Sequence, residues 1–399
     1  MRALVLAEYY PRAADATLGV WAHRQAMAAR DAGADVRVLV LHRPLPPLST
    51  VRRLRLAALR EAMNQPRREV LDGITVEYLR YLSPPRPWSY ASWGAWAAPA
   101  LRLALARVRR AFAFDLVHAH YAVPAGDALR RAAPDVPLLV SVHGGDVHGR
   151  HSQSPAVLAS LAHARLVLAN SAGTARRCRE RGAQRTRVVH LGTEVPAEPA
   201  TAPATPALVT VGNLIARKRQ GDVIEALALL RNRHPDLRYV IVGDGPERGS
   251  LLALAEARGV LDRIELRGRL PHPQAVAAAR SATLFVLPSL AEAFGVSYVE
   301  AMAAGIPAIG ARGEDGPEEI AAAGGGMELV PPRRPQALAE AIDGLLSDPA
   351  RLAMLRGQAR DTVTREFTWE RCGRETLTAY ADVLGDRPAP RPYVDVDRA

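Results

Sequence analysis

Short runs of apolar, often β-branched residues alternate along the chain with longer amphipathic stretches. In the first half the apolar runs lie at 4–7, 36–41, 116–120, 138–142, 166–169 and 188–190, and they predict strands. Residues 19–31 carry apolar positions at helical spacing and are closed by Gly33, which predicts the first helix. Strands that alternate with helices form parallel sheets. The first half is therefore predicted to be a Rossmann-like, doubly wound α/β domain.

A segment rich in Pro, Ala and Thr, residues 196–206, interrupts this alternation. It has little to bury and cannot hold a helix, so it is predicted to be a domain linker. Beyond it, apolar runs at 208–211, 239–242, 264–266, 284–287 and 308–309 predict a second parallel sheet, and 368–384 predicts a last helix. We expect an N-terminal domain over 1–195, a C-terminal domain over 207–380 and an irregular tail over 381–399. Ligands of open parallel sheets bind at the carboxyl ends of the strands, which places the expected active site between the domains.

The composition adds limits on size and compartment. With 399 residues, of which 48% are hydrophobic, the chain can bury about two or three cores. Its start does not resemble a secretory signal, and no apolar run reaches the ~20 residues of a membrane-spanning helix. The only cysteines, Cys178 and Cys372, are too few for a disulfide framework or a four-ligand zinc site. We therefore expect a soluble protein of the reducing cytoplasm.

Positive charge is concentrated in the first half. Residues 1–195 contain 28 arginines against 14 acidic residues, whereas the remainder contains 24 basic and 27 acidic residues. The excess fits either an anionic partner surface or simply a high-arginine proteome, and both interpretations stay open. The sequence contains no nucleic-acid-binding motif, so nucleic acid is not an expected partner. Lys218 is the only lysine, which indicates that its position needs a compact ammonium group.

Two carboxylates eight residues apart form the strongest chemical signal. Glu292 and Glu300 flank a predicted loop-to-helix junction, and Gly295 between them lets the backbone approach a ligand. The first N–H groups of such a helix favour an anion such as a diphosphate. Glu300 has two oxygens that can accept hydrogen bonds from a ribose diol. The alternative is an ordinary capped helix with a solvated glutamate, which would not require Phe294, Gly295 and Gly305 together.

A second signal follows the first strand of the C-terminal half. Arg217, Lys218 and Arg219 are adjacent cations on a predicted loop, where they can neutralise a diphosphate as it leaves without a metal. The alternative is a solvated basic turn. On the opposite wall His143, followed by two glycines, can hydrogen-bond a sugar hydroxyl or the acceptor, although a lone histidine is more often structural.

Other sequence features argue against competing enzyme classes. His118 and His120 lie at a strand end and are predicted to be buried packing residues, and the segment from Gly243 to Glu247 lacks the third glycine of a dinucleotide fingerprint. The chain has no Walker A motif, no H-E-x-x-H and no D-x-D pair placed for a metal. These absences disfavour hydrolase and kinase functions, and no metal or cofactor is expected.

The motifs together resemble glycosyltransferase family 4, the retaining enzymes with a GT-B fold of two Rossmann-like domains facing a cleft. The resemblance covers nearly the whole chain, and its most specific element is the E-x7-E motif from Glu292 to Glu300. It implies transfer of a sugar from a nucleoside-diphosphate sugar to a glycan, lipid-linked or small-molecule hydroxyl, with the departing phosphate as the base. It implies that His143 lies near the reacting sugar, that Lys218 and the neighbourhood of Arg217 hold the diphosphate, and that Glu292 meets the sugar and phosphates. Arg269 and Leu270 are expected beside the base, and the expected catalytic residues are His143, Lys218 and Glu292. The substrate-binding residues that it implies are Gly19, Asn213, Arg217, Lys218, Gly243, Arg269, Leu270, Glu292, Ala293, Phe294, Gly295, Val296 and Glu300.

The chain departs from the family pattern at two positions. Asn213 stands where many members have arginine, so Arg217 is expected to supply that charge, and Gly19 is single where many members have paired glycines. A guanine base favours a carboxylate partner, and Leu270-Pro271-His272 offers none, which favours UDP over GDP. The alternatives are a nucleotide-sugar epimerase or hydrolase on the same fold and a catalytically silent sugar-nucleotide-binding protein.

One N-terminal segment predicts contact with an anionic membrane or an amphipathic acceptor. It carries arginines at 52, 53, 55, 60, 67 and 68 and then four aromatic residues, Trp88, Tyr90, Trp93 and Trp96. Such rings suit the headgroup region, while arginines meet lipid phosphates. The alternative is that Trp93 and Trp96, at helical spacing, pack internally. The inner face of the plasma membrane is thus a second expected location beside the cytoplasm.

Overall fold

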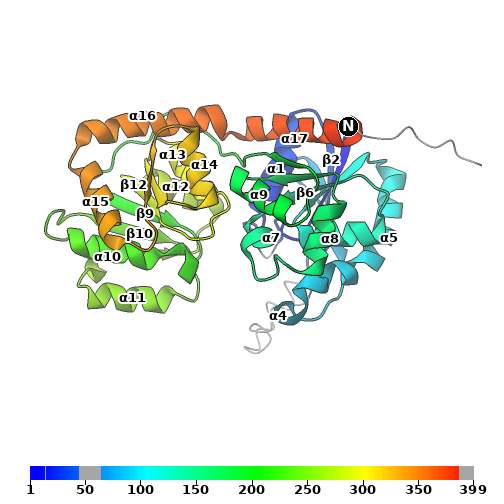
Figure 1. Ribbon diagram of the computed structural model, residues 1–399, viewed down its shortest axis with the longest axis horizontal. Helices are drawn as coiled ribbons and strands as arrows, with labels where there is room; N and C mark the ends of the chain where they lie inside the picture. The colour runs from blue at the N-terminus through cyan, green and yellow to red at the C-terminus, as the bar shows by residue number, and fades with distance from the viewer. Residues whose placement is uncertain (14, 45–63, 386–399) are drawn as a thin grey trace, which may run out of the picture.

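The structure, a computed structural model, describes residues 1–13, 15–44 and 64–385, which form two α/β domains side by side (Figure 1). The N-terminal sheet has the order β3-β4-β2-β1-β5-β6-β7-β8, and only β3 runs antiparallel to its neighbour. Its strands are β1 (Arg2–Ala7), β2 (Asp35–His42), β3 (Arg68–Leu71), β4 (Ile74–Arg80), β5 (Leu116–His120), β6 (Leu138–Val142), β7 (Leu166–Ala169) and β8 (Thr186–Val188).

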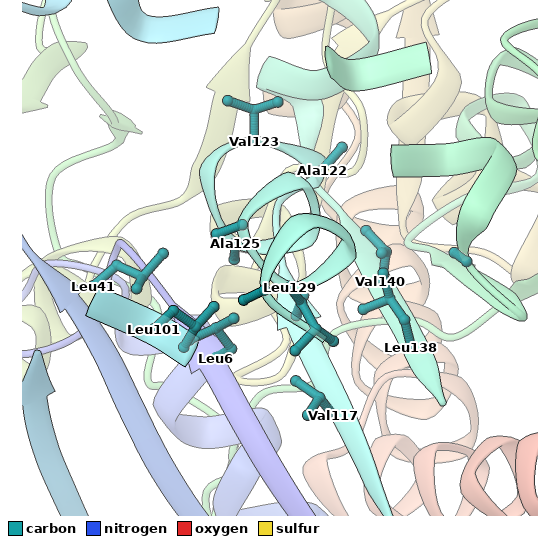
Figure 2. Packing of buried hydrophobic residues seen from close by; sticks show 14 of the residues in the cluster. Leu6, Leu41, Leu101, Val117, Ala122, Val123, Ala125, Leu129, Leu138 and Val140 are labelled. Atoms are coloured by element: carbon teal, nitrogen blue, oxygen red, sulfur yellow. The ribbon is translucent and has the colours of Figure 1, made fainter. Parts of the chain in front are cut away.

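The N-terminal sheet is covered on both faces because its central strands are apolar on both sides. The helical segments of this domain are α1 (Val20–Asp31), α4 (Arg86–Ser89), η1 (Tyr90–Ser92), α5 (Trp93–Ala111), η2 (Ala122–Gly126), α6 (Asp127–Ala132), α7 (Gly144–His148), α8 (Pro155–His163) and α9 (Ala172–Glu180). Figure 2 shows Leu6 and Leu41, from neighbouring strands, close to Leu101 of α5. Burial of each such side chain stabilises the fold by about 1.5–3 kcal/mol.

The C-terminal domain is built on a parallel sheet with the order β11-β10-β9-β12-β13-β14. Its strands are β9 (Ala207–Val211), β10 (Arg238–Val242), β11 (Ile264–Gly268), β12 (Leu284–Leu287), β13 (Ala308–Ala311) and β14 (Met327–Val330). Its helical segments are η3 (Ala216–Lys218), α10 (Gln220–Leu230), α11 (Arg248–Ala257), η4 (Leu261–Arg263), α12 (His272–Arg280), α13 (Val296–Met302), α14 (Asp315–Ala323), α15 (Pro335–Leu346) and α16 (Pro349–Glu366). One core packs α10, α11 and α15 on the sheet, and the other packs α12, α13, α14 and α16.

The predicted fold class is confirmed, and every predicted strand is present to within two residues at each end. Three strands were not predicted: the β3–β4 hairpin and β14. In β4, buried residues alternate with half-buried ones such as Thr75 and Glu77, so the segment lacks a continuous apolar run. Half-buried strands of this kind are weaker signals than the continuous runs of a central parallel strand.

The last helix, α17 (Trp369–Gly385), returns to the N-terminal domain. In Figure 1, α16 runs along the top of the C-terminal domain and α17 continues along the top of the N-terminal domain, where it packs on α1. Tyr380 and Val383 join the core of the N-terminal sheet, and Gln25 donates a hydrogen bond to Thr376. The structure therefore differs from the predicted boundaries, which assign residues up to 380 to the C-terminal domain. The apolar face of α17 is buried against the opposite domain, and sequence position alone does not reveal this packing.

The chain crosses between the domains twice, and the two crossings lie side by side. The N–H of Thr193 donates to the carbonyl of Phe367, and Thr193 pairs with Thr368 in an isolated β-bridge. Cys178 and Cys372 are buried free thiols, one behind each face of the N-terminal sheet. None of the described helices combines the length and apolarity needed to cross a bilayer.

Candidate active site

A cavity of about 520 Å³ lies between the two domains. Loops that follow strands of both sheets line it, as their parallel arrangement brings the carboxyl ends of the strands to one edge. The predicted site residues that line it are His143, Asn213, Arg217, Lys218, Glu292, Ala293, Phe294, Gly295 and Val296. The domains almost touch here, since a Cβ added to Gly144 would lie 3.3 Å from that of Ala293.

Lys218 and Glu292 form an ion pair on the C-terminal wall of the cavity. The Nζ of Lys218 lies 2.5 Å from Oε2 of Glu292, and Ser289 donates to the same oxygen at 2.8 Å. Arg217 approaches that oxygen at 3.7 Å. Burial raises the pKa of Glu292, but the Lys218 and Arg217 charges and the Ser289 hydrogen bond outweigh it and hold the pKa below its usual value. Glu292 is therefore an ionised, oriented carboxylate at neutral pH.

The loop from Glu292 to Gly295 presents backbone to the cavity. Gly295 precedes α13 with φ 88°, and a Cβ there would lie 2.5 Å from the ring of Tyr298, so only glycine fits. The side chain of Phe294 is buried and stacks on His190 at 5.8 Å between ring centroids. Phe294 is thus a core residue whose backbone, with those of its neighbours, forms the wall.

Glu300 lies in a second, adjoining cavity of about 350 Å³. This cavity shares Trp21 and Val296 with the first, so the two adjoin at these residues. Oε1 of Glu300 is 2.7 Å from Nε2 of His272, the first residue of α12. His272 also lines the second cavity. The sequence analysis did not assign this histidine a role, because the two residues are 28 positions apart and no motif links them.

His143 faces the cavity from the N-terminal wall and is neutral at pH 7, because burial lowers its pKa to about 3. Its Nε2 lies 3.1 Å from Nδ1 of His120, and the two rings stack. His118 stacks on His120 in turn and hydrogen-bonds Ser141 and Tyr380, the latter in α17. His118 and His120 are buried, as expected of packing residues, and they also connect His143 to the last helix.

The remaining predicted residues lie around the cavities. Arg269 donates to Asp15 and Thr17, both at 2.8 Å, and so bridges the domains. Leu270 packs beside Val242 at the ends of β11 and β10.

Two predicted glycines have conformational roles. Gly19 has φ 65°, and a Cβ on it would overlap the backbone of Tyr9 at 2.2 Å. Gly243 has φ 145°, and its Cβ would lie 1.9 Å from the carbonyl oxygen of Gly212. Neither glycine is among the described residues that line the two cavities.

Several residues that line the larger cavity were not predicted as site residues from the sequence. Trp21, Tyr121 and Asn170 all line the larger cavity from the N-terminal side. Tyr121 has φ 75° and Ala291, across the cleft, has φ 52°, backbone strain that concentrates at functional sites. Tyr121 and Asn170 directly follow β5 and β7. Their position at the carboxyl end of a strand could have identified them as site residues from the sequence. No cluster of three or more His, Cys, Asp or Glu suited to a metal occurs in the described part of the chain.

Comparisons with known proteins agree with this architecture. Residues 18–195 match the family described as Glycosyltransferase Family 4, and residues 194–362 match Glycosyl transferases group 1. Glycogen synthase of Mycobacterium tuberculosis is 28% identical over 421 aligned residues, covering 98% of this chain and 97% of that protein. Alpha-D-kanosaminyltransferase of Streptomyces kanamyceticus is 30% identical over 178 residues, 45% of this chain and 46% of that one.

Two solved structures show the same fold. Sucrose-phosphate synthase of Thermosynechococcus elongatus superposes with a TM-score of 0.76 at 20% identity, covering 97% of this chain and all of the other. The Anabaena protein HepE, in complex with UDP and glucose, superposes with a TM-score of 0.70 at 21% identity over 96% of this chain. At these identities the likeness concerns the fold alone.

Proposed function

Because the chain belongs to the glycosyltransferases of family 4 and has a GT-B fold, we propose that it transfers a sugar from a nucleoside-diphosphate sugar to a hydroxyl acceptor with retention of configuration. The observation that most supports this proposal is the wall of the larger cavity, where Lys218 and Arg217 lie beside the ionised Glu292. Lys218 has three N–H donors and gives one to Glu292, which leaves donors for a phosphate oxygen. The half-exposed Arg217 adds a second cation for the departing diphosphate.

The proposed path of the donor follows the two joined cavities. The sugar and diphosphate occupy the larger cavity beside Glu292 and Lys218, and the ribose reaches Glu300 in the smaller one. Two cations at the diphosphate can do the electrostatic work of a metal, so the proposed reaction is metal-independent.

Retention is proposed to proceed by attack on the face from which the phosphate leaves. A double displacement needs a free carboxylate nucleophile. Glu292 is the carboxylate among the described residues that line the larger cavity, and Lys218 and Ser289 hold its Oε2. His143 is neutral and suited to hydrogen bonding with a sugar hydroxyl. The departing phosphate then takes the proton of the acceptor.

We propose a UDP-sugar as donor. Leu270, Pro271 and His272 offer no carboxylate to the edge of a guanine, and UDP is the nucleotide in the HepE complex of similar fold. Relatives with other donors exist: one 30% identical over 181 residues is a GDP-mannose-dependent mannosyltransferase of Corynebacterium glutamicum. The nucleotide therefore has to be measured.

The acceptor is proposed to be a glycan or a lipid-linked molecule reached at an anionic membrane. Trp88 and Trp96 are 75% and 52% exposed, and Leu103, two turns beyond Trp96 on α5, is 76% exposed. Helix α5 carries four arginines and no acidic residue. Trp93, by contrast, is buried in the core, so the alternative of internal packing holds for it. Arg52, Arg53, Arg55 and Arg60 lie outside the described residues.

A thermal-shift screen with UDP, GDP and their sugar conjugates tests the donor, since a ligand of the native state raises the melting temperature. We expect UDP and a UDP-sugar to stabilise the protein and GDP to have a smaller effect. The product is then analysed by NMR for its anomeric configuration. Release of free sugar or of an epimer without acceptor would support the hydrolase or epimerase alternative, and no response to any nucleotide would overturn the proposal.

A further inference from the structure

The N-terminal wall of the cleft contains polar atoms that lack a partner. Nε1 of Trp21 and Oδ1 of Asn170 are both buried, and neither has a hydrogen-bond partner within the described part of the chain. Both residues line the larger cavity. Buried polar groups are paired in the great majority of cases, so each exception needs an explanation. At a ligand cavity the simplest explanation is that the ligand supplies the partner.

Trp21 marks the place where the two cavities join. It belongs to the first turn of α1 and lines both cavities, as does Val296 on the opposite wall. Its ring lies edge-on to that of His143, with 6.0 Å between centroids. A ligand that reaches from Glu292 to Glu300 must pass this tryptophan. The indole N–H is a donor only, so its partner is an oxygen at the junction of diphosphate and ribose.

Asn170 lies in the larger cavity only. It follows β7 directly and is 8% exposed, so its carboxamide is held inside the wall instead of in bulk water. A carboxamide both donates and accepts hydrogen bonds. Sugar hydroxyl groups have the same double capacity, whereas phosphate oxygens only accept. The part of a donor that matches Asn170 is therefore the transferred sugar.

We propose that Trp21 and Asn170 are donor-binding residues contributed by the N-terminal domain, Trp21 at the diphosphate-ribose junction and Asn170 at the sugar. The inference rests on the proposed function and deepens it. Both domains then contribute to the donor site, because the residues of the C-terminal wall cannot supply the hydrogen bonds of Trp21 and Asn170. Donor binding then draws the domains together, in addition to the contacts between Arg269 and Asp15.

Two variants test the proposal: Trp21→Phe, which keeps an aromatic ring but removes the N–H and the five-membered ring, and the near-isosteric Asn170→Leu. The matched controls are Trp93→Phe, whose Nε1 donates to Pro84 and Ser89 inside the N-terminal domain, and Asn232→Leu, an exposed amide of the C-terminal domain. Dissociation constants of UDP and of UDP-glucose are measured by calorimetry, and the melting temperature of each ligand-free variant is recorded.

Trp21→Phe is expected to weaken UDP and UDP-glucose binding alike by roughly tenfold, and to lower the melting temperature less than Trp93→Phe does, because the N–H that it removes is unpaired in the free protein. Asn170→Leu is expected to weaken UDP-glucose by a similar factor and to leave UDP unchanged. Trp93→Phe should lower the melting temperature without changing either affinity, and Asn232→Leu should change neither.

The outcomes separate this inference from the function on which it rests. If the wild-type protein binds UDP or UDP-glucose but Trp21→Phe binds them equally well, the role of Trp21 is wrong. If Asn170→Leu weakens UDP and UDP-glucose to the same extent, its assignment to the sugar is wrong. If the wild-type protein binds neither ligand, the proposed donor fails, and the inference fails with it.

Discussion

Lys218 and Glu292 lie 74 positions apart in the sequence, yet the Nζ of one is 2.5 Å from Oε2 of the other. The pair joins the loop after β9 to the loop after β12, two neighbouring strands of the C-terminal sheet. Lysine and glutamate are both largely buried here, so each depends on the other for its charge. Breaking such a pair from one side is costly, because it leaves an uncompensated buried charge.

Replacement of Lys218 should therefore impair both ligand binding and stability. We expect Lys218→Ala to weaken donor binding by about 1.5–3 kcal/mol and to lower the free energy of unfolding by about 3 kcal/mol. Lys218→Arg should also be impaired, because a planar fork does not replace a point charge at a buried site.

Calorimetry with UDP and urea denaturation measure the two effects of the Lys218 variants. Arg258→Ala is the control, since it breaks an exposed ion pair with Glu225 on the far side of the domain. The double variant Lys218→Met with Glu292→Gln should recover part of the lost stability. Donor affinity unchanged in Lys218→Ala would contradict the site assignment.

The local pattern was sufficient to predict the strands and to single out the E-x7-E segment. Each of these depends on residues that are close in sequence, such as Gly295 between Glu292 and Glu300. The partners of the predicted residues were not predictable, because they come from distant segments: His272 for Glu300 and Asp15 for Arg269. The same reason hides the return of α17 to the N-terminal domain.

Some residues whose type was predicted to matter serve the fold more than the ligand. A glycine in a motif signals either a close ligand or a close backbone, and the sequence does not distinguish these cases. At Gly19 and Gly243 a close backbone is present, as their missing Cβ atoms face Tyr9 and Gly212, and their contact with a ligand stays a prediction. Trp21 is the reverse example, since an amphipathic helix predicts core packing for it and gives no sign of its unpaired N–H.

The pairing of His272 with Glu300 should govern recognition of the ribose. Glu300→Ala is expected to weaken UDP binding by about 1.5–3 kcal/mol through the lost hydrogen bond to the diol. His272→Ala removes the hydrogen bond that orients Oε1 of Glu300. The carboxylate is then less well placed for the ribose diol, so UDP should lose part of its advantage over 2′-deoxy-UDP. His234→Ala is a matched control, because its Nε2 pairs with Asp343 at 2.8 Å without lining either cavity. An unaltered ratio of the two affinities in His272→Ala would argue against this role.

Stability should fall on acidification because of the buried histidines. Burial lowers the pKa of His118 and of His143 to about 3 and that of His120 well below its usual value. The unfolded chain then binds more protons than the folded protein below pH ~6.5, so the free energy of unfolding decreases as the pH falls. Burial raises the pKa of Asp146 to about 7, and its contribution has the opposite sign, lost as the pH rises through 7.

The destabilising contribution of the three histidine rings exceeds the stabilising contribution of the Asp146 carboxyl group. We therefore expect the free energy of unfolding to fall by a net amount on the order of 3 kcal/mol between pH 6.5 and pH 5. Urea denaturation at the two pH values measures it. Asp146→Asn removes the opposing contribution and should make the loss steeper. A wild-type protein equally stable at both values would show that these rings are protonated in the folded state.

Chelation should leave the activity intact. Arg217 and Lys218 line the cavity in which we propose that the diphosphate departs, and two cations there can take the role of a divalent ion. We expect the rate of sugar transfer after exhaustive treatment with EDTA to equal that of the untreated enzyme. Loss of activity that magnesium or manganese restores would show that the arginine and the lysine are insufficient.

The exposed side of α5 should bring the enzyme to anionic membranes. Trp96 and Leu103 lie seven residues apart, so they share one face of the helix, and both are more than half exposed. The helix carries four arginines and no acidic residue, and one of the four, Arg107, pairs with Glu77 of β4. Each basic residue near an anionic surface contributes about 1 kcal/mol, so the binding should be reversible and salt-sensitive.

Flotation with anionic and neutral vesicles at low and high salt measures this binding. We expect recovery with anionic vesicles at low salt only, and we expect the double variant Trp96→Ser with Leu103→Ser to reduce it. Leu229→Ser is the control, because Leu229 is 55% exposed on α10 of the other domain. If the double variant lost sugar transfer to lipid-linked acceptors but kept its affinity for UDP, the membrane would act on acceptor delivery alone. Equal, negligible flotation under all four conditions would instead favour an acceptor free in solution.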